Sequence, residues 1–168
     1  MIDVCEASGV SRATLYRYFS RKEDLLDAVG EYVSRNFIAG IRSVAAESTE
    51  PADRIRMVFK FIVGYTNQVK ADRILEIEPG FVIGFLQSHF AQHVAVLNEV
   101  LAPVYDDIET HTGLKINRPF VSELLLRGQE STSLIPGGAS WVTLPDALGD
   151  MLKQLYRISE KRSRSARP

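Results

Sequence analysis

The chain has 168 residues, 45% of them hydrophobic and 24% charged, a composition ordinary for one globular domain or a domain with a small appendage. Cys5 is the single cysteine, so an intrachain disulfide is excluded and a reducing, cytoplasmic location is expected. No apolar run of membrane-spanning length and no secretion-type leader stand out. We therefore expect no membrane association.

The net charge of −1 is unevenly distributed. Residues 1–22 carry a net charge of +2 and residues 157–168 a net charge of +4, which leaves −7 for the residues between them. A basic end joined to an acidic body is typical of a protein that directs one end at DNA. Residues 161–168, rich in Arg and Ser, are predicted to form a solvated basic tail.

In chain order, the first predicted element is a short helix over residues 2–8. It should end at Gly9, because glycine readily adopts the left-handed conformation at a helix C′ position. Ser11 suits the N-cap of the next helix, with its hydroxyl accepting from the backbone N–H of Ala13 or Thr14. The sequence therefore predicts two short helices joined by a sharp turn.

The second of these helices has two different faces. Leu15 and Phe19 fall on one side at helical spacing, whereas Arg17 projects almost opposite. Arginine bonds bidentately to guanine, and the Ala13 methyl suits a thymine methyl. The hydroxyls of Thr14 and of nearby tyrosines suit phosphates. This face is typical of a helix that lies in the major groove of DNA.

The following segment, Ser20-Arg-Lys-Glu23, has a capping-box pattern, with Ser20 as N-cap and Glu23 reaching back to it. A helix N-terminus attracts phosphate, and Lys22 adds a full positive charge there. The alternative is a solvated helical hairpin whose charges serve solubility. Two capped helices in series favour DNA binding.

Residues 4–26, VCEASGVSRATLYRYFSRKEDLL, resemble the helix-turn-helix of TetR-type bacterial transcriptional regulators. The resemblance implies an all-α fold, with an N-terminal DNA-binding unit followed by a helical ligand-binding and dimerisation domain. It also implies DNA contacts by Ser11, Arg12, Thr14, Tyr16, Arg17, Tyr18 and Lys22. The family has a whole helix and the start of a second before this segment. We therefore expect a truncated helix-turn-helix over residues 1–30, a helical domain over residues 31–160 and the basic tail beyond them.

Apolar residues at helical spacing predict further helices along the rest of the chain. These are a long helix from Arg21 to about Ala46, a helix opening at Pro51, and a stretch over residues 82–108 that Pro103 interrupts. Asn117 should cap a helix over residues 118–133. Residues 135–138 read as a loop before a last helix that starts near Thr143.

Two functional regions are expected in this helical part. The TetR resemblance places a dimer interface on the last two helices, although the same leucines would also suit an intrachain core. The candidates are Leu124, Leu125, Leu148, Leu152 and Leu155. A pocket for a small, largely apolar effector is expected between two earlier helices. Its candidates are Phe59, Ile62, Tyr65, Phe85, His89 and Phe90.

No pattern for catalysis or for a cofactor is present in the sequence. His89 and His93 have the one-turn spacing at which two imidazoles share a metal, but a zinc site needs further ligands. We expect no metal site, no cofactor and no enzyme activity. The leading hypothesis is a ligand-responsive, homodimeric repressor that binds a palindromic operator in double-stranded DNA. The alternative is a helical small-molecule-binding or dimerisation module that does not bind DNA, because its helix-turn-helix is incomplete.

Overall fold

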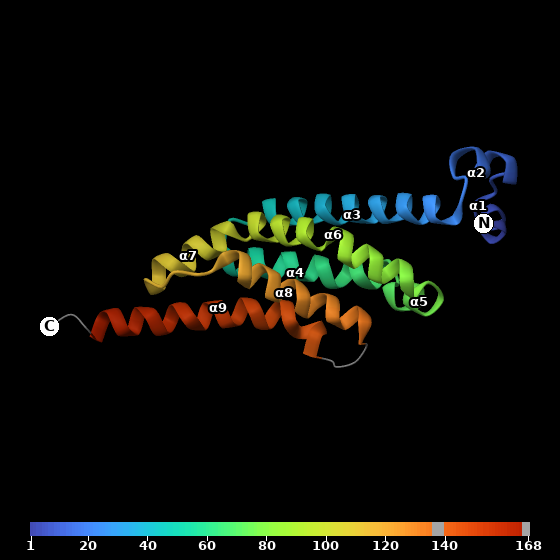
Figure 1. The fold of residues 1–168 in the computed structure, drawn as a ribbon. Helices are drawn as coiled ribbons and strands as arrows, with labels where there is room; N and C mark the ends of the chain where they lie inside the picture. The colour runs from blue at the N-terminus through green and yellow to red at the C-terminus, as the bar shows by residue number, and fades with distance from the viewer. Residues whose placement is uncertain (136–139, 166–168) are drawn as a thin grey trace. The chain divides into compact units, whose positions relative to one another are not determined.

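The computed structural model describes residues 1–135 and 140–165, and every regular element within them is an α-helix (Figure 1). The all-α fold class expected from the sequence is confirmed. The chain divides into two compact units, one over residues 1–36 and one that begins at Phe37. Helix α3, Lys22–Ala46, contains residues of both units.

The first unit contains two short helices before α3. They are α1, Ile2–Ser8, and α2, Arg12–Tyr18, and they pack against each other. This arrangement matches the two helices and the sharp turn that the sequence predicts.

The second unit holds the hydrophobic core. Its further helices are α4 (Pro51–Gln68), α5 (Ala71–Ile77), α6 (Pro79–Val100), α7 (Ala102–Thr112), α8 (Arg118–Leu134) and α9 (Ser140–Ser165). Helix α9 packs antiparallel to α4, and α6 packs against α8 (Figure 1). Ile41, Phe59, Ile62, Leu97 and Leu126 are almost fully enclosed between them.

Most helix boundaries lie at the proline, glycine and capping residues of the sequence. The break between α6 and α7 precedes Pro103, and Gly113 ends α7 with φ 71°. The Asn117 side chain accepts a 3.3 Å hydrogen bond from the backbone N–H of Phe120 and so caps α8 as predicted. The sequence analysis missed α5, which Lys70, with φ 51°, separates from α4.

Helix α9 differs from its prediction at both ends. It begins at Ser140, before the predicted start near Thr143, and Pro145 lies inside it. It continues to Ser165, so the basic stretch is helical over residues 161–165. Of the predicted loop at residues 135–138, Ile135 follows α8 and the other three residues lie outside the described part of the chain.

Two glycines allow side chains of α4 to approach neighbouring helices closely. A Cβ atom on Gly40 of α3 would lie 2.0 Å from Cζ of Phe61. A Cβ atom on Gly149 of α9 would lie 2.7 Å from a terminal nitrogen of Arg56. The Arg56 guanidinium also pairs with Asp53, and its Nε lies 3.2 Å from Asp146 of α9. Glycine at these two positions therefore sets the distance between α4 and its neighbours.

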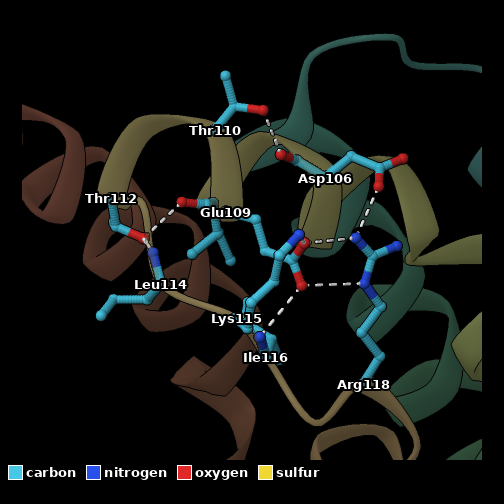
Figure 2. Close-up of polar contacts among 9 residues, drawn as sticks. Asp106, Glu109, Thr110, Thr112, Leu114, Lys115, Ile116 and Arg118 are labelled. Carbon is cyan, nitrogen blue, oxygen red and sulfur yellow. Dashed lines mark hydrogen bonds and ion pairs between the residues drawn. The ribbon is translucent and has the colours of Figure 1, made fainter.

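An ion cluster holds the connection between α7 and α8 (Figure 2). The Glu109 carboxylate accepts from the Lys115 ammonium at 3.0 Å, the Ile116 backbone N–H at 3.1 Å and the Arg118 guanidinium at 3.0 and 3.3 Å. Arg118 also donates to Asp106 at 2.7 Å. The hydrogen bond from Arg118, followed by those from Ile116 and Lys115, lowers the pKa of Glu109 to about 2. The cluster fixes how the chain turns from one helix into the next.

One helix of the described residues, α6, is long and apolar enough to cross a membrane by length and composition alone. The expectation that no apolar run reaches membrane-spanning length is therefore wrong for this helix. Core helices of soluble proteins meet the same criteria, and Val96, Leu97 and Val100 of α6 belong to the core.

Candidate nucleic-acid interface

The turn between α1 and α2 has the backbone geometry expected from the sequence. Gly9 adopts φ 70° and ψ 8°, the left-handed conformation that ends α1. Ser11 is extended, and its hydroxyl accepts a 3.2 Å hydrogen bond from the backbone N–H of Thr14. The Ser11 and Thr14 hydroxyl oxygens are also 2.9 Å apart. The glycine end of α1 and the serine cap of α2 are both confirmed.

Helix α2 separates its apolar residues from its polar ones. Leu15 is 7% exposed, and Phe19, directly after the helix, is partly buried and donates its backbone N–H to the Leu15 carbonyl at 2.9 Å. Most residues predicted to contact DNA are exposed instead, namely Ser11, Arg12, Ala13, Tyr16, Arg17, Tyr18 and Lys22, whereas Thr14 is partly buried. Side chains suited to base edges and phosphates are therefore accessible along α2.

Arg17 and Tyr18, in the last turn of α2, contact each other. The Arg17 guanidinium carbon lies over the Tyr18 ring, 5.2 Å from its centroid. This distance is within the range of a cation–π interaction. Tyr18 is 70% exposed, so the pair lies in solvent. The sequence analysis placed both residues at the DNA surface but did not anticipate their contact.

The N-terminus of α3 is capped by a different residue from the one expected. Asp24, rather than Glu23, accepts the backbone N–H of Arg21 through Oδ2 at 2.9 Å. Its Oδ1 accepts from the Arg21 guanidinium at 2.8 Å, and this hydrogen bond lowers the pKa of Asp24. The expected capping box of Ser20 and Glu23 is therefore wrong. The helix begins at Lys22, one residue later than that pattern requires, so its third residue is Asp24.

The six residues predicted to line a ligand pocket lie in three environments. Phe59 and Ile62 are enclosed in the hydrophobic core. The Phe90 ring lies 4.5 Å from the guanidinium carbon of Arg127. The remaining three, Tyr65, Phe85 and His89, belong to a group of neighbouring rings. Ring contacts thus group three of the six residues, and the pocket stays a prediction.

This group of rings, here termed the ring cluster, joins three helices. It consists of Phe37 of α3, Phe61 and Tyr65 of α4, and Phe85, His89 and His93 of α6. The centroids of Phe37 and His93 are 4.6 Å apart, as are those of Phe85 and His89. The predicted pocket did not include Phe37, Phe61 or His93. The one-turn spacings of Phe61 to Tyr65 and of His89 to His93 were the signals that could have indicated them.

His93 is the most buried polar member of the ring cluster, with 4% of its surface exposed. Burial, with a smaller contribution from His89, lowers its pKa to about 4. The imidazole is therefore neutral at neutral pH and packs as an aromatic ring. Within the described residues, no group of three or more His, Cys, Asp or Glu side chains is arranged to hold a metal ion.

The leucines predicted to form a dimer interface differ in accessibility. Leu148 and Leu152 are buried in the core of the single chain, and Leu125 and Leu155 pack partly against it. Leu124 is 58% exposed. The same two helices expose further apolar side chains, among them Phe120, Met151 and Ile158.

Comparison with known proteins places the N-terminal segment in a family. Residues 1–29 match the family described as bacterial regulatory proteins, tetR family. This segment holds α1, α2 and the beginning of α3. The match covers this N-terminal segment, and the all-helical fold agrees with the architecture that the resemblance implies.

Several curated relatives share one name, nucleoid occlusion factor SlmA. The protein of Serratia proteamaculans (strain 568) is 25% identical over 122 residues, which are 72% of this chain and 61% of the relative. That of Photorhabdus laumondii is 28% identical over 91 residues, 54% of this chain and 45% of the relative. That of Marinomonas sp. (strain MWYL1) is 26% identical over 102 residues, 61% of this chain and 47% of the relative. The chain thus spans less than two thirds of their length. No solved structure matches it.

Proposed function

We propose that the protein is a DNA-binding transcriptional regulator that acts in the cytoplasm as a homodimeric repressor on a palindromic operator. The observation that carries this proposal is the exposed face of α2, which presents Arg12, Arg17 and two tyrosines on a capped helix backed by Leu15. The match of this segment to the tetR family supports it. The relatives are named for the nucleoid, which also fits a DNA-bound protein.

The chemistry of the side chains suggests a division of roles. Arg17 reads a guanine edge, and the Ala13 methyl contacts a thymine methyl. Lys22, in the first turn of the 25-residue helix α3, supplies a positive charge for a DNA phosphate, to which the partial positive charge of that helix end adds. The Tyr16 hydroxyl on α2 and the Ser11 hydroxyl at its N-cap add phosphate contacts that carry no sequence information.

A homodimer supplies the two DNA-binding units that a palindromic operator requires. Among the leucines predicted for the interface, Leu124 is the accessible one, and Phe120 lies one turn before it on α8. Met151 and Ile158 are exposed on α9. We therefore propose that the partner covers these exposed side chains, whereas Leu148 and Leu152 support the interface from within the core.

The effector in this proposal is a small, largely apolar molecule that binds near the ring cluster. Phe37, the first residue of the second unit, contacts His93 and Tyr65 in this cluster. Phe37 is also part of α3, whose N-terminal half lies in the DNA-binding unit. An effector that changes the packing around Phe37 would shift the population between DNA-competent and incompetent dimers through α3.

DNA binding to palindromes from the protein's own promoter region, at two salt concentrations, tests the proposal. We expect sequence preference and an affinity that falls steeply with salt. Arg17→Ala should relax base preference, whereas Lys22→Ala should weaken all sequences about equally and reduce the salt dependence. Absence of both sequence preference and salt dependence would refute the regulator function. The opposite effects of the two variants would refute the assigned roles.

A second candidate function is a helical dimerisation or small-molecule-binding module without DNA binding. The position of the hydrophobic core favours it, because the core cluster consists of residues from Phe37 onward, whereas in the first unit Leu15 is the buried hydrophobic residue. A protein that forms a stable dimer but binds no duplex in the salt series would support this candidate over the first.

A further inference from the structure

The Tyr18 ring contacts the Arg17 guanidinium, although Tyr18 is exposed and no packing forces the two side chains together. We propose that Tyr18 is a positioning residue, whose aromatic ring holds the Arg17 guanidinium in the orientation that reads a base edge. This inference rests on the proposed DNA-binding function and adds a source of base specificity to it.

The backbone that carries Arg17 and Tyr18 is held in place by the buried face of α2 and by the hydrogen bond at its C-terminal end. Leu15 is buried below it, and the Phe19 backbone N–H closes the helix end on the Leu15 carbonyl at 2.9 Å. Arg17 and Tyr18 lie between these two fixed points. The 5.2 Å distance from the guanidinium carbon to the ring centroid then depends on their side-chain rotamers alone.

Two arginines of this unit show why the type of partner matters. Arg21 donates to Asp24 at 2.8 Å, so a carboxylate occupies its N–H donors. Arg17 lies over a ring face, which attracts the cation without supplying an acceptor oxygen. The N–H donors of Arg17 remain available for the two acceptors of guanine, O6 and N7. Of these two arginines, Arg17 is therefore prepared for bidentate base recognition.

Restricting a long side chain before binding improves discrimination between bases. An exposed arginine samples many rotamers and loses that freedom when it docks on a base edge. A ring that limits the rotamers in the free protein removes part of this loss. The gain applies to the base that Arg17 reads and leaves phosphate contacts unchanged, so it appears as specificity rather than as overall affinity.

A different role for Tyr18 gives different expectations. If its hydroxyl binds a DNA phosphate, as the TetR resemblance implies, removal of the hydroxyl alone should weaken all sequences about equally. If its ring positions Arg17, removal of the hydroxyl should leave base preference intact, and only loss of the ring should relax it. Tyr18→Phe and Tyr18→Leu separate these two roles, and neither disturbs a buried contact, because Tyr18 is largely exposed.

The experiment compares the full chain with Tyr18→Phe, Tyr18→Leu and the control Tyr32→Leu, a matched change at another exposed tyrosine, on α3. Binding selection from a random-sequence duplex library defines the wild-type half-site. Affinities are then measured for that site and for its single-base variants at two salt concentrations. For Tyr18→Leu we expect preference at one base pair to fall about two- to fivefold with the salt slope unchanged, whereas Tyr18→Phe and Tyr32→Leu keep the wild-type preference.

A second readout does not require DNA. The ring should shift the NMR resonances of the Arg17 side-chain methylene protons upfield in the free protein, and Tyr18→Leu should abolish this shift whereas Tyr18→Phe retains it. Absence of the shift in the wild type overturns the inference. So does a Tyr18→Leu variant with undiminished base preference, or a Tyr18→Phe variant that weakens every sequence. A wild type without any sequence preference refutes the proposed DNA-binding function itself, and the inference fails with it.

Discussion

Single buried groups in the second unit give the protein a pH-dependent stability. Burial raises the pKa of Glu130 on α8 to about 7, against the opposing charge of Arg127. The folded state therefore keeps a proton that the unfolded chain releases from its ordinary pKa of 4.5 upward. Because Glu130 holds more protons in the native state in this window, its contribution to the free energy of unfolding falls as the pH rises from 4.5 to about 7.

Glu130→Gln removes this titration and resembles the protonated side chain. We expect the variant to exceed the wild type in stability by about 1–2 kcal/mol at pH 8, after allowance for solvent screening, and by little at pH 4.5. Urea unfolding at both pH values measures the difference. The pKa of His93, lowered to about 4, reduces the free energy of unfolding towards acid in wild type and variant alike. Its effect therefore cancels in the comparison. An equal gain in stability at both pH values would show that burial does not raise the pKa of the Glu130 carboxyl.

The Phe61 ring lies so close to Gly40 that a larger residue at position 40 should destabilise the protein. Gly40→Ala places a methyl group 2.0 Å from Cζ of Phe61, so the ring or the helix must move, and we expect a loss of about 1–3 kcal/mol. Gly64→Ala on α4 is the matched control, because no atom of another helix lies within 4 Å of its added Cβ. It should be neutral or stabilising by up to about 1 kcal/mol. Denaturant unfolding compares the two, and a Gly40→Ala protein as stable as the control would refute the packing argument.

At the scale of elements, charges hold the turn from α7 to α8, in addition to the packing of Ile116 against the core. Glu109 receives donors from the connecting segment and from the first residue of α8, so one carboxylate ties three parts of the chain together (Figure 2). Because the pKa of Glu109 is about 2 in the folded state, the unfolded state takes up a proton first as the pH falls. The contribution of Glu109 to the free energy of unfolding is therefore present above the ordinary pKa of 4.5 and is lost as the pH falls towards 2.

Glu109→Gln should therefore flatten the acid limb of the stability profile. We expect the wild type to lose stability between pH 4.5 and 2 more steeply than the variant, and to be the more stable of the two at neutral pH. Thermal unfolding along a pH series measures both effects. Glu123→Gln is the control, because Glu123 pairs with Arg127 on the surface of α8 and its loss should change stability little. Identical acid profiles for wild type and Glu109→Gln would contradict the role of the cluster.

At the scale of the whole molecule, the proposed dimer depends on which leucines are accessible. Leu124 is exposed, so Leu124→Lys should shift a dimer towards monomer without unfolding the chain. Leu148 is buried within the chain, so Leu148→Ala should cost about 2–5 kcal/mol of stability at any protein concentration. Sedimentation equilibrium with denaturant unfolding separates the two effects. A monomeric wild type would refute the homodimer, and a fully dimeric Leu124→Lys variant would exclude this face as the interface.

Local signals in the sequence accounted for most helix boundaries. Gly9, Ser11, Gly113 and Asn117 act through bonds and dihedral angles within a few residues, so their effects are readable without the fold. The capping box at the start of α3 failed by one residue, because Glu23 and Asp24 are adjacent acceptors and only the helix register decides which of them reaches the backbone N–H at the helix start.

The sequence by itself determined the all-α class, the cap and turn of α2, and which residues of α2 are accessible, since a helical period assigns Leu15 to one face and Arg17 to the other. Only the tertiary structure decided how residues far apart in the chain meet. It placed Leu148 in the core and Leu124 in solvent, and it brought Phe37 against His93 in the ring cluster. It also set the Arg17 guanidinium over the Tyr18 ring. The physical reason is that apolar spacing shows that a face is buried but not against which partner, and rotamers are chosen by the packing around them.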